Sequence, residues 1–392
     1  MRKIACFVAV ISVVMVVTLA ACSPRAPSSS SAPAPATSTT KPSSSVSASP
    51  SATAKPSSSP TATTSPVASR QAELEAAAKK EGKVTLWAPH AKNANTYLAK
   101  FKARYPWLTL EAWDANGETI VEKLVTEAKA GKHNVDVISM DEATIQDLTP
   151  YFVKYDWPNV KLADWPKDTM PASGLYIRSS MSVFGPVYNT KTVTGADVPN
   201  SWDAIKDPKW KGKAGAPVSA QDIPMLTAAL WGSDGKLDWD KSFAYWREVF
   251  KNTQARTVQT YTTGTQLLGA GEYSLLIASA GSTTFRENMG GLPVSLAPVG
   301  QIIGMGQNWA LVKDAPHPNA AKLLADFVTT TEGATDFANI AYHVSLNPTA
   351  TGAKPNVMMQ EQKIKVFVVP PALLNAENGK KSSQFWNSML GY

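Results

Sequence analysis

Cysteine is almost absent from this sequence of 392 residues, because its two cysteines, Cys6 and Cys22, both lie near the N-terminus. The long remainder therefore offers no thiol pair for a disulfide and no cysteine ligand for a metal. Its four histidines lack HExxH-type spacing, and no P-loop, dinucleotide loop or Gly-x-Ser-x-Gly motif occurs. These absences argue against a hydrolase or a nucleotide-dependent enzyme. We expect a protein that is not an enzyme and uses no cofactor.

Acidic residues are missing from residues 1–69, which carry five basic residues and so account for +5 of the formal net charge of +7. The rest of the chain is therefore close to neutral. It shows no basic stripe and no stacking motif, so nucleic acid is not an expected partner.

No apolar run is long enough to span a bilayer comfortably. Residues 1–22 have a basic start, an apolar run over 4–17 and small residues before Cys22, which together predict a signal peptide. The position of Cys22 resembles the lipobox of bacterial lipoproteins, whose cysteine carries a lipid. The alternatives are an ordinary signal peptide and an uncleaved anchor helix. Residues 23–69 are almost purely Ser, Ala, Pro and Thr, and predict a disordered tether.

From Arg70 onward the chain is long enough for two α/β lobes with separate cores. Strand-like runs at 84–87, 108–113 and 135–139 alternate with segments of helical spacing, which predicts a mostly parallel sheet covered by helices. An extended run at 180–189 is interpreted as the first crossover into a second lobe. A strand at 273–278, a polar elbow at 280–283 and strands at 292–299 and 309–312 then carry the chain back.

Several short segments together resemble the extracellular solute-binding proteins of bacterial ABC importers, in the branch that binds ferric iron, polyamines and phosphonates. These segments are 82–87, 101–106, 127–138, 187–190, 199–213, 269–272 and 314–321. The resemblance extends over roughly residues 83–341, and its order and spacing are more specific than any single piece.

The resemblance implies a two-lobed α/β fold of the type II periplasmic-binding-protein kind, with two crossover strands as a hinge. We expect lobe 1 to begin with 70–182, the hinge and lobe 2 to occupy 183–297, and residues 298–392 to return to lobe 1 and supply C-terminal helices. The implied partners are a small-molecule or ion ligand and the permease and ATPase of an importer. We expect a monomer outside the cytoplasm, held at the membrane by a lipid on Cys22.

Two loops of lobe 1 hold candidate ligand residues. His90 lies close to a histidine position of the ferric binders, and Asp141 matches their acidic ligand. The two would be metal ligands if the cargo is ferric iron, and no other metal site is assigned. The alternative for His90 is a solvent-facing or helix-capping residue, and Asp141 would stabilise a helix start without any ligand.

The elbow departs from the ferric pattern. Ferric binders carry adjacent tyrosines there, whereas this chain has Gly281, Ser282 and Thr283, followed by Arg286. Hydroxyls and backbone N–H groups at a helix start suit an oxyanion. Arg286, or alternatively Arg178, could pair with a carboxylate or phosphonate.

From lobe 2, Ser219 and Gln221 match a stretch that holds the companion anion in ferric binders, although Ser219 is equally suited to cap a helix. The preferred ligand is a small anion or anionic organic compound such as a phosphonate, with ferric iron second. A carbohydrate-binding or adhesion lipoprotein is the alternative, because of the tether and the twelve tryptophans. A degenerate hydrolase is a third possibility.

Overall fold

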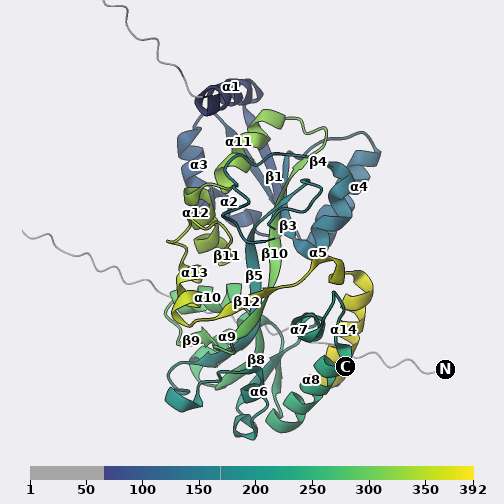
Figure 1. The fold of residues 1–392 in the computed structure, drawn as a ribbon, viewed down its shortest axis with the longest axis vertical. Coiled ribbons are helices and arrows are strands. Elements are labelled where there is room, and N and C mark those ends of the chain that lie inside the picture. The colour runs from purple at the N-terminus through teal and green to yellow at the C-terminus, as the bar shows by residue number, and fades with distance from the viewer. Residues whose placement is uncertain (1–65, 168) are drawn as a thin grey trace, which may run out of the picture. The chain divides into compact units, whose positions relative to one another are not determined.

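The computed structural model describes residues 66–167 and 169–392 (Figure 1). The predicted signal peptide, Cys22 and residues 23–65 of the predicted tether lie outside these residues. The last four residues of the predicted tether, 66–69, are instead the start of helix α1 (Pro66–Glu81). The described part is a mixed α/β structure in which one continuous sheet passes through both lobes. This confirms the predicted two-lobed fold class.

The main path of the sheet runs in the order β2-β1-β3-β10-β5-β8-β6-β7, with four further strands on β5 and β10. The strands are β1 (Lys83–Ala88), β2 (Thr109–Asp114), β3 (Val137–Asp141), β4 (Phe152–Val153), β5 (Ile177–Asn189), β6 (Ala214–Pro217), β7 (Arg256–Val258), β8 (Leu275–Ala280), β9 (Val294–Leu296), β10 (Gln301–Val312), β11 (Val344–Ser345) and β12 (Lys365–Val368).

In lobe 1, β2, β1 and β3 are parallel and β10 is antiparallel to β3. Strand β1 is buried from Val84 to Ala88, as expected for a strand covered on both faces. The helices of this lobe are α1 (Pro66–Glu81), α2 (Ala94–Tyr97), α3 (Ala99–Arg104), α4 (Gly117–Lys129), α5 (Glu142–Ile145), α11 (Pro318–Val328), α12 (Thr331–Ala341) and α13 (Lys354–Glu361), with short 3₁₀ turns at Ala91–Asn93 and Gln146–Tyr151.

Lobe 2 repeats the same plan, with β7, β6 and β8 parallel and β5 and β9 antiparallel beside them. Its helices are α6 (Trp202–Ile205), α7 (Ile223–Trp231), α8 (Trp239–Thr253), α9 (Tyr261–Ala270) and α10 (Gly281–Met289), with 3₁₀ turns at Gly195–Asp197 and Pro208–Trp210. The carboxyl ends of the parallel strands in each lobe therefore lie along one sheet edge, where the following loops gather.

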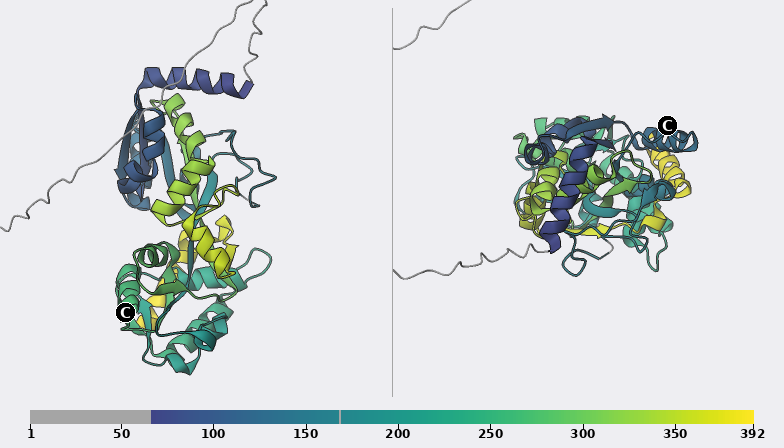
Figure 2. Two further views of the ribbon diagram at one scale, coloured as in Figure 1. Left: turned by 90° about the vertical axis from the view of Figure 1, so that its left-hand side faces the viewer. Right: turned by 90° about the horizontal axis from the view of Figure 1, so that it is seen from above.

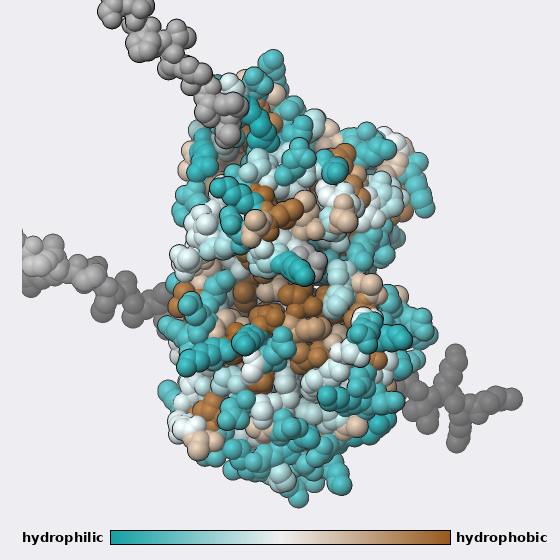
Figure 3. Space-filling view, in the orientation of Figure 1, coloured by the Kyte–Doolittle hydropathy of each residue, from teal (hydrophilic) through white to brown (hydrophobic). Residues whose placement is uncertain are grey.

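Two long strands, β5 and β10, connect the lobes and pair antiparallel from Ile177 to Phe184. The chain crosses a third time near its end. Strand β12 pairs with β10, and the segment after it passes through a 3₁₀ turn (Pro371–Leu373) to α14 (Ala376–Leu390). Apolar side chains gather on this face at the level of β12 (Figure 3).

Helix α14 packs on lobe 2. The Trp386 indole N–H donates to the carbonyl of Pro217 at 2.9 Å, and the Phe385 ring stacks on Phe243 at 4.0 Å between centroids. On the side of lobe 1, the Gln146 amide donates to the Pro371 carbonyl at 3.1 Å. The terminal segment is therefore a strap that joins the two lobes in addition to the predicted pair of hinge strands.

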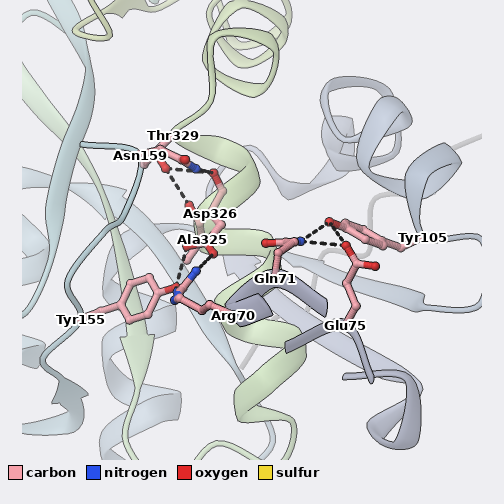
Figure 4. Close-up of polar contacts among 9 residues, drawn as sticks. All are labelled: Arg70, Gln71, Glu75, Tyr105, Tyr155, Asn159, Ala325, Asp326 and Thr329. Carbon is pink, nitrogen blue, oxygen red and sulfur yellow. Dashed lines mark hydrogen bonds and ion pairs between the residues drawn. The ribbon is translucent and has the colours of Figure 1, made fainter. Parts of the chain in front are cut away.

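Helix α1 lies across the end of lobe 1 next to α11 (Figure 2). Arg70 donates to Asp326 at 3.0 Å and to the Tyr155 hydroxyl at 2.7 Å, and that hydroxyl donates to Asp326 at 2.5 Å (Figure 4). Gln71 donates to Tyr105 at 3.0 Å on the other side of the helix. The first described helix is thus held to the body of lobe 1 by two separate sets of polar contacts.

Candidate functional site

Three helices of lobe 2 begin just after parallel strands, namely α7 after β6, α9 after β7 and α10 after β8. Because β6 pairs with both β7 and β8, the three helix starts lie along one edge of the sheet. The first turn of a helix has free N–H groups and a partial positive charge. This edge is therefore suited to negative groups.

The predicted elbow is the start of α10. Ala280 precedes the helix and provides no side-chain cap, so the elbow backbone is not satisfied by its own N-cap residue. A Cβ atom at Gly281 would overlap Cγ2 of Val183 on β5, so glycine at this position is explained by close packing against the hinge. Ser282 is partly exposed, whereas Thr283 is buried. The hydroxyls of this pair are the groups that a ligand could contact.

The other two lobe 2 candidates make internal contacts. The Ser219 hydroxyl accepts the backbone N–H of Tyr261 at 3.0 Å, which satisfies one N–H group in the first turn of α9. Gln221 donates to Asn387 of α14 at 3.4 Å. Ser219 therefore has the capping role that was the alternative to ligand binding. It acts on α9, which follows the neighbouring strand β7, and not on α7.

Asp141 of lobe 1 caps α5, because its carboxylate accepts the backbone N–H of Thr144 at 3.0 Å and the Thr144 hydroxyl at 2.8 Å. It also acts on lobe 2. Desolvation, and then the negative charge of Asp141, raise the pKa of Asp222 at the start of α7. Burial and the charge of Asp222 in turn raise the pKa of Tyr261. The negative charge of Asp141 in lobe 1 thus acts on Asp222 at the start of α7 in lobe 2.

Tyr261 links this group to the elbow, since its ring lies 6.3 Å from Phe184, which pairs with Ala280 in the sheet. Asp222 and Tyr261 were missed by sequence reasoning. Asp222 directly follows the candidate Gln221, and Tyr261 follows a strand at a Thr-capped helix start, so both carried a usable signal.

The two candidate arginines, Arg286 and Arg178, differ in their exposure to solvent and in their partners. Arg286 is exposed and donates to the Thr262 hydroxyl at 3.2 Å and to Glu287 at 2.9 Å. Arg178 is buried and pairs with the buried Glu142 at 2.9 Å. Glu142, the residue after Asp141, therefore forms an internal ion pair with Arg178.

A glycine makes room for this ion pair. A Cβ atom at Gly306 on β10 would overlap both Oε2 of Glu142 and Nε of Arg178. The Tyr176 hydroxyl also donates to Glu142 at 3.1 Å. The pair is thus built into the junction of lobe 1 and the hinge.

His90 lies in a cluster of five rings, which we call the aromatic cluster: His90, Tyr97, Trp309, Phe337 and His343. The His90 ring is 4.9 Å from Phe337 and 6.2 Å from His343, measured between centroids. Burial lowers the pKa of His90 to about 4, against an opposing effect of Asp114. Burial, and then the nearby His90, lower the pKa of His343 to about 3. Both imidazoles are therefore neutral at neutral pH. His90 neither faces solvent freely nor caps a helix with its side chain.

A metal centre is not assembled in the described part of the chain. No three His, Cys, Asp or Glu residues among residues 66–167 and 169–392 come together as a metal-binding group. Asp141 is occupied as a helix cap, and His90 is surrounded by aromatic rings.

The fold and the loops at the facing edges of the lobes define a type II periplasmic-binding-protein architecture. The chain belongs to the family of bacterial extracellular solute-binding proteins, whose family model matches residues 96–365. It is the solute-binding component of an ABC importer, and the location of this family is extracytoplasmic. This confirms the resemblance and favours an importer over the carbohydrate-adhesion alternative.

Solved structures share the fold. Iron-bound HitA from Pseudomonas aeruginosa superposes with a TM-score of 0.60 at 16% identity, over 78% of this chain and 99% of that chain. AfuA from Actinobacillus pleuropneumoniae, with exogenous fructose-6-phosphate bound, gives 0.59 at 18% identity, over 79% and 99%. IdiA (FutA) from Trichodesmium, with iron and citrate ligands, gives 0.62 at 12% identity, over 79% and 99%. Identities this low show the fold alone.

Among curated proteins, no sequence matches the chain. Within the described residues, no helix has both the length and the apolar character needed to cross a membrane.

Proposed function

We propose that this chain captures a small anionic organic solute, such as a phosphonate or phosphate ester, between its lobes and delivers it to a membrane permease. The observation that carries the ligand class is the convergence of the starts of α7, α9 and α10 on one sheet edge, opposite the Asp141 loop of lobe 1. The oxyanion lies at the start of α10, where Ser282 and Thr283 supply hydroxyls and the backbone supplies N–H groups.

Asp141 and Asp222 indicate which other groups the ligand carries besides its oxyanion. Asp141 and Asp222 repel a bare anion, so the solute also presents hydroxyl or amino donors to these carboxylates. A solute of this kind satisfies both halves of the site, and closure of the lobes on it requires no bond chemistry. The protein is accordingly a binding component without catalytic activity.

The sign of the ligand charge is tested by Asp222→Asn, because this change removes one negative charge from the site and leaves a side chain of the same size. For methylphosphonate, an anion with no amino group or alcohol hydroxyl to donate to Asp222, we expect affinity to rise by about 1.4 kcal/mol, which is roughly tenfold. The measurement is a titration of the full-length chain, purified in detergent, with methylphosphonate, phosphate esters, spermidine and ferric citrate.

The matched control is Asp234→Asn, since Asp234 is exposed in the turn between α7 and α8 and has a left-handed backbone that asparagine accepts. It should leave affinity unchanged. If Asp222→Asn instead weakens binding of spermidine or iron, and no phosphonate or phosphate binds, the solute is a cation and the proposal is wrong.

We also propose that a lipid on Cys22 holds a monomer at the membrane, with residues 23–65, which precede helix α1, as the tether. The residues of the signal segment support this, and the described part begins beyond them. Cys22→Ser should move the protein from the membrane fraction to the soluble fraction. Equal membrane retention of this variant would contradict lipid anchoring, and light scattering at twice the monomer mass would contradict the monomer.

A further inference from the structure

Asp222 occupies the N-cap position of α7 and does not cap the helix. A capping residue ordinarily has an extended backbone, which lets its side chain accept N–H groups of the first helical turn. Asp222 instead has a helical backbone, with φ of −82° and ψ of −16°, and its side chain makes no capping hydrogen bond. The residue is exposed. Its carboxylate is therefore not consumed by the helix that it precedes.

The N–H groups of this first turn are satisfied from elsewhere. The Ile223 N–H donates to a backbone carbonyl of the preceding turn at 3.1 Å, and Pro224 has no N–H to satisfy. The Met225 N–H donates to the Ser382 hydroxyl of α14 at 2.9 Å, although the two residues are 157 positions apart. Ser382 is fully buried, and its hydroxyl also donates to the Gln221 carbonyl at 2.6 Å. Ser382 thus performs for α7 the task that an N-cap side chain usually performs.

Two further bonds hold α14 against the same loop. The Trp386 indole N–H donates to the Pro217 carbonyl at 2.9 Å, and the Gln221 amide donates to Asn387 at 3.4 Å. Ser382 and Trp386 are four residues apart, so they lie on one face of α14. That face therefore holds the loop between β6 and α7, which carries Asp222, along its whole length.

The terminal strap, residues 365–392, is also bonded to the loop that carries Asp141. The Gln146 amide donates to the Glu142 carbonyl at 3.0 Å and to the Pro371 carbonyl of the strap at 3.1 Å. Glu142 is the first residue of α5, which Asp141 caps. The strap therefore contacts both loops that carry the acidic residues, and α14 is placed relative to lobe 1 as well as lobe 2.

We propose that Ser382 is a positioning residue of the ligand site, because it caps α7 in place of Asp222 and so leaves the Asp222 carboxylate available to the solute. This inference rests on the proposed function, which places Asp222 at the ligand. A carboxylate that capped α7 would have its charge offset by the start of the helix and would face the helix N–H groups. Ser382 itself is buried and acts only through α7.

The first test needs no ligand. Thermal unfolding of the full-length chain in detergent compares Ser382→Ala, Asp222→Ala and the double variant with the wild type. Ser382→Ala leaves the Met225 N–H without its acceptor, and Asp222 lies three residues earlier, which is the spacing at which an aspartate caps a helix. Asp222→Ala should therefore lower the melting temperature by about 2 °C more in the Ser382→Ala background than in the wild type. Equal shifts in both backgrounds would overturn the inference.

The second test is calorimetric titration of the same full-length chain with methylphosphonate. In the wild-type background Asp222→Asn should raise the affinity roughly tenfold, as the proposed function requires. In the Ser382→Ala background the rise should be less than about threefold, because the carboxylate has turned from the solute to α7. If Ser382 were only structural, its loss would lower the melting temperature and leave the tenfold rise unchanged, and that result contradicts the inference.

Ser383→Ala is the matched control. Ser383 is the next residue of α14, and its hydroxyl donates to the Gly379 carbonyl of the same helix at 3.0 Å. This variant should leave the effects of both Asp222 substitutions as they are in the wild type. An equal reduction in this variant would show that any change in α14 is sufficient, and it would rule out a specific role of Ser382.

The two tests separate this inference from the proposed function. Methylphosphonate binding combined with additive shifts of the melting temperature overturns the role of Ser382 and leaves the anionic solute standing. Absence of methylphosphonate binding by the wild type counts against the anionic solute. Non-additive shifts of the melting temperature in that case still support the capping of α7 by Ser382.

Discussion

Acidification should destabilise this protein through the two partly buried histidines of the aromatic cluster. In the unfolded chain an imidazole titrates near pH 6.5. In the folded protein, burial lowers the pKa of His90 to about 4 and that of His343 to about 3. The unfolded state therefore takes up protons first as the pH falls. The stabilisation is fully present above pH 6.5 and is lost progressively below it.

The size of the effect follows from the same pKa values. Each unit of pH below 6.5 favours the unfolded state by about 1.4 kcal/mol per histidine until the folded histidine also protonates. Between pH 7 and pH 4.5 the two histidines together should lower the free energy of unfolding by about 5 kcal/mol. That is a large share of the stability of an ordinary domain, which is about 5–15 kcal/mol.

The assay is urea unfolding followed by tryptophan fluorescence at pH 7, 6, 5.3 and 4.5. Because other groups also titrate, the decisive quantity is the difference between variants in the pH dependence of the unfolding free energy. His343→Gln should reduce the loss between pH 7 and 4.5 by about 2.5 kcal/mol. His133→Gln is the matched control, since His133 is exposed, and should leave the loss unchanged. Identical pH dependence of His343→Gln and the wild type would refute the reasoning.

Two further predictions concern packing. Gly306→Ala should lower the unfolding free energy by at least about 3 kcal/mol, because the new methyl group displaces Glu142 from its buried ion pair. Gly352→Ala, where the nearest atom would be 3.8 Å away, is the control in the same thermal unfolding measurement, and equal losses would contradict the explanation. Trp386→Phe should lower the unfolding free energy by about 2 kcal/mol, because it removes the hydrogen bond to Pro217 that holds the terminal segment on lobe 2. It should also expose α14 to proteolysis, and unchanged protection of the C-terminus would contradict that role.

Local patterns predicted much of the fold. The strand expected at 273–278 is β8 (Leu275–Ala280), and the crossover expected at 180–189 is β5 (Ile177–Asn189). The strand expected at 309–312 is only the last third of β10 (Gln301–Val312). Its first part was missed because Gly304 and Gly306 weaken the strand signal. Those glycines are required by neighbours that are remote in sequence, since a side chain at Gly304 would overlap Val366.

The candidate site was predictable only in part, because its loops were found and their internal contacts were not. Asp141 was placed at a helix start by its position after a strand, and it does cap α5. Nothing near His343 in the sequence indicates that it meets His90, which is more than 250 residues away. The isolated histidine follows a helix and matches no motif. His343 meets His90 only because the chain returns to lobe 1 after the second hinge strand.

The sequence alone determined the alternation of strands and helices and the family, because these depend on local spacing and on short segments in a fixed order. Only the tertiary structure decided which polar groups are already satisfied. Glu142 is neutralised by Arg178, whereas the buried atoms of His90 and Tyr97 have no partner within the described residues. The distinction depends on close approach between remote segments, for which hydrophobic periodicity carries no information.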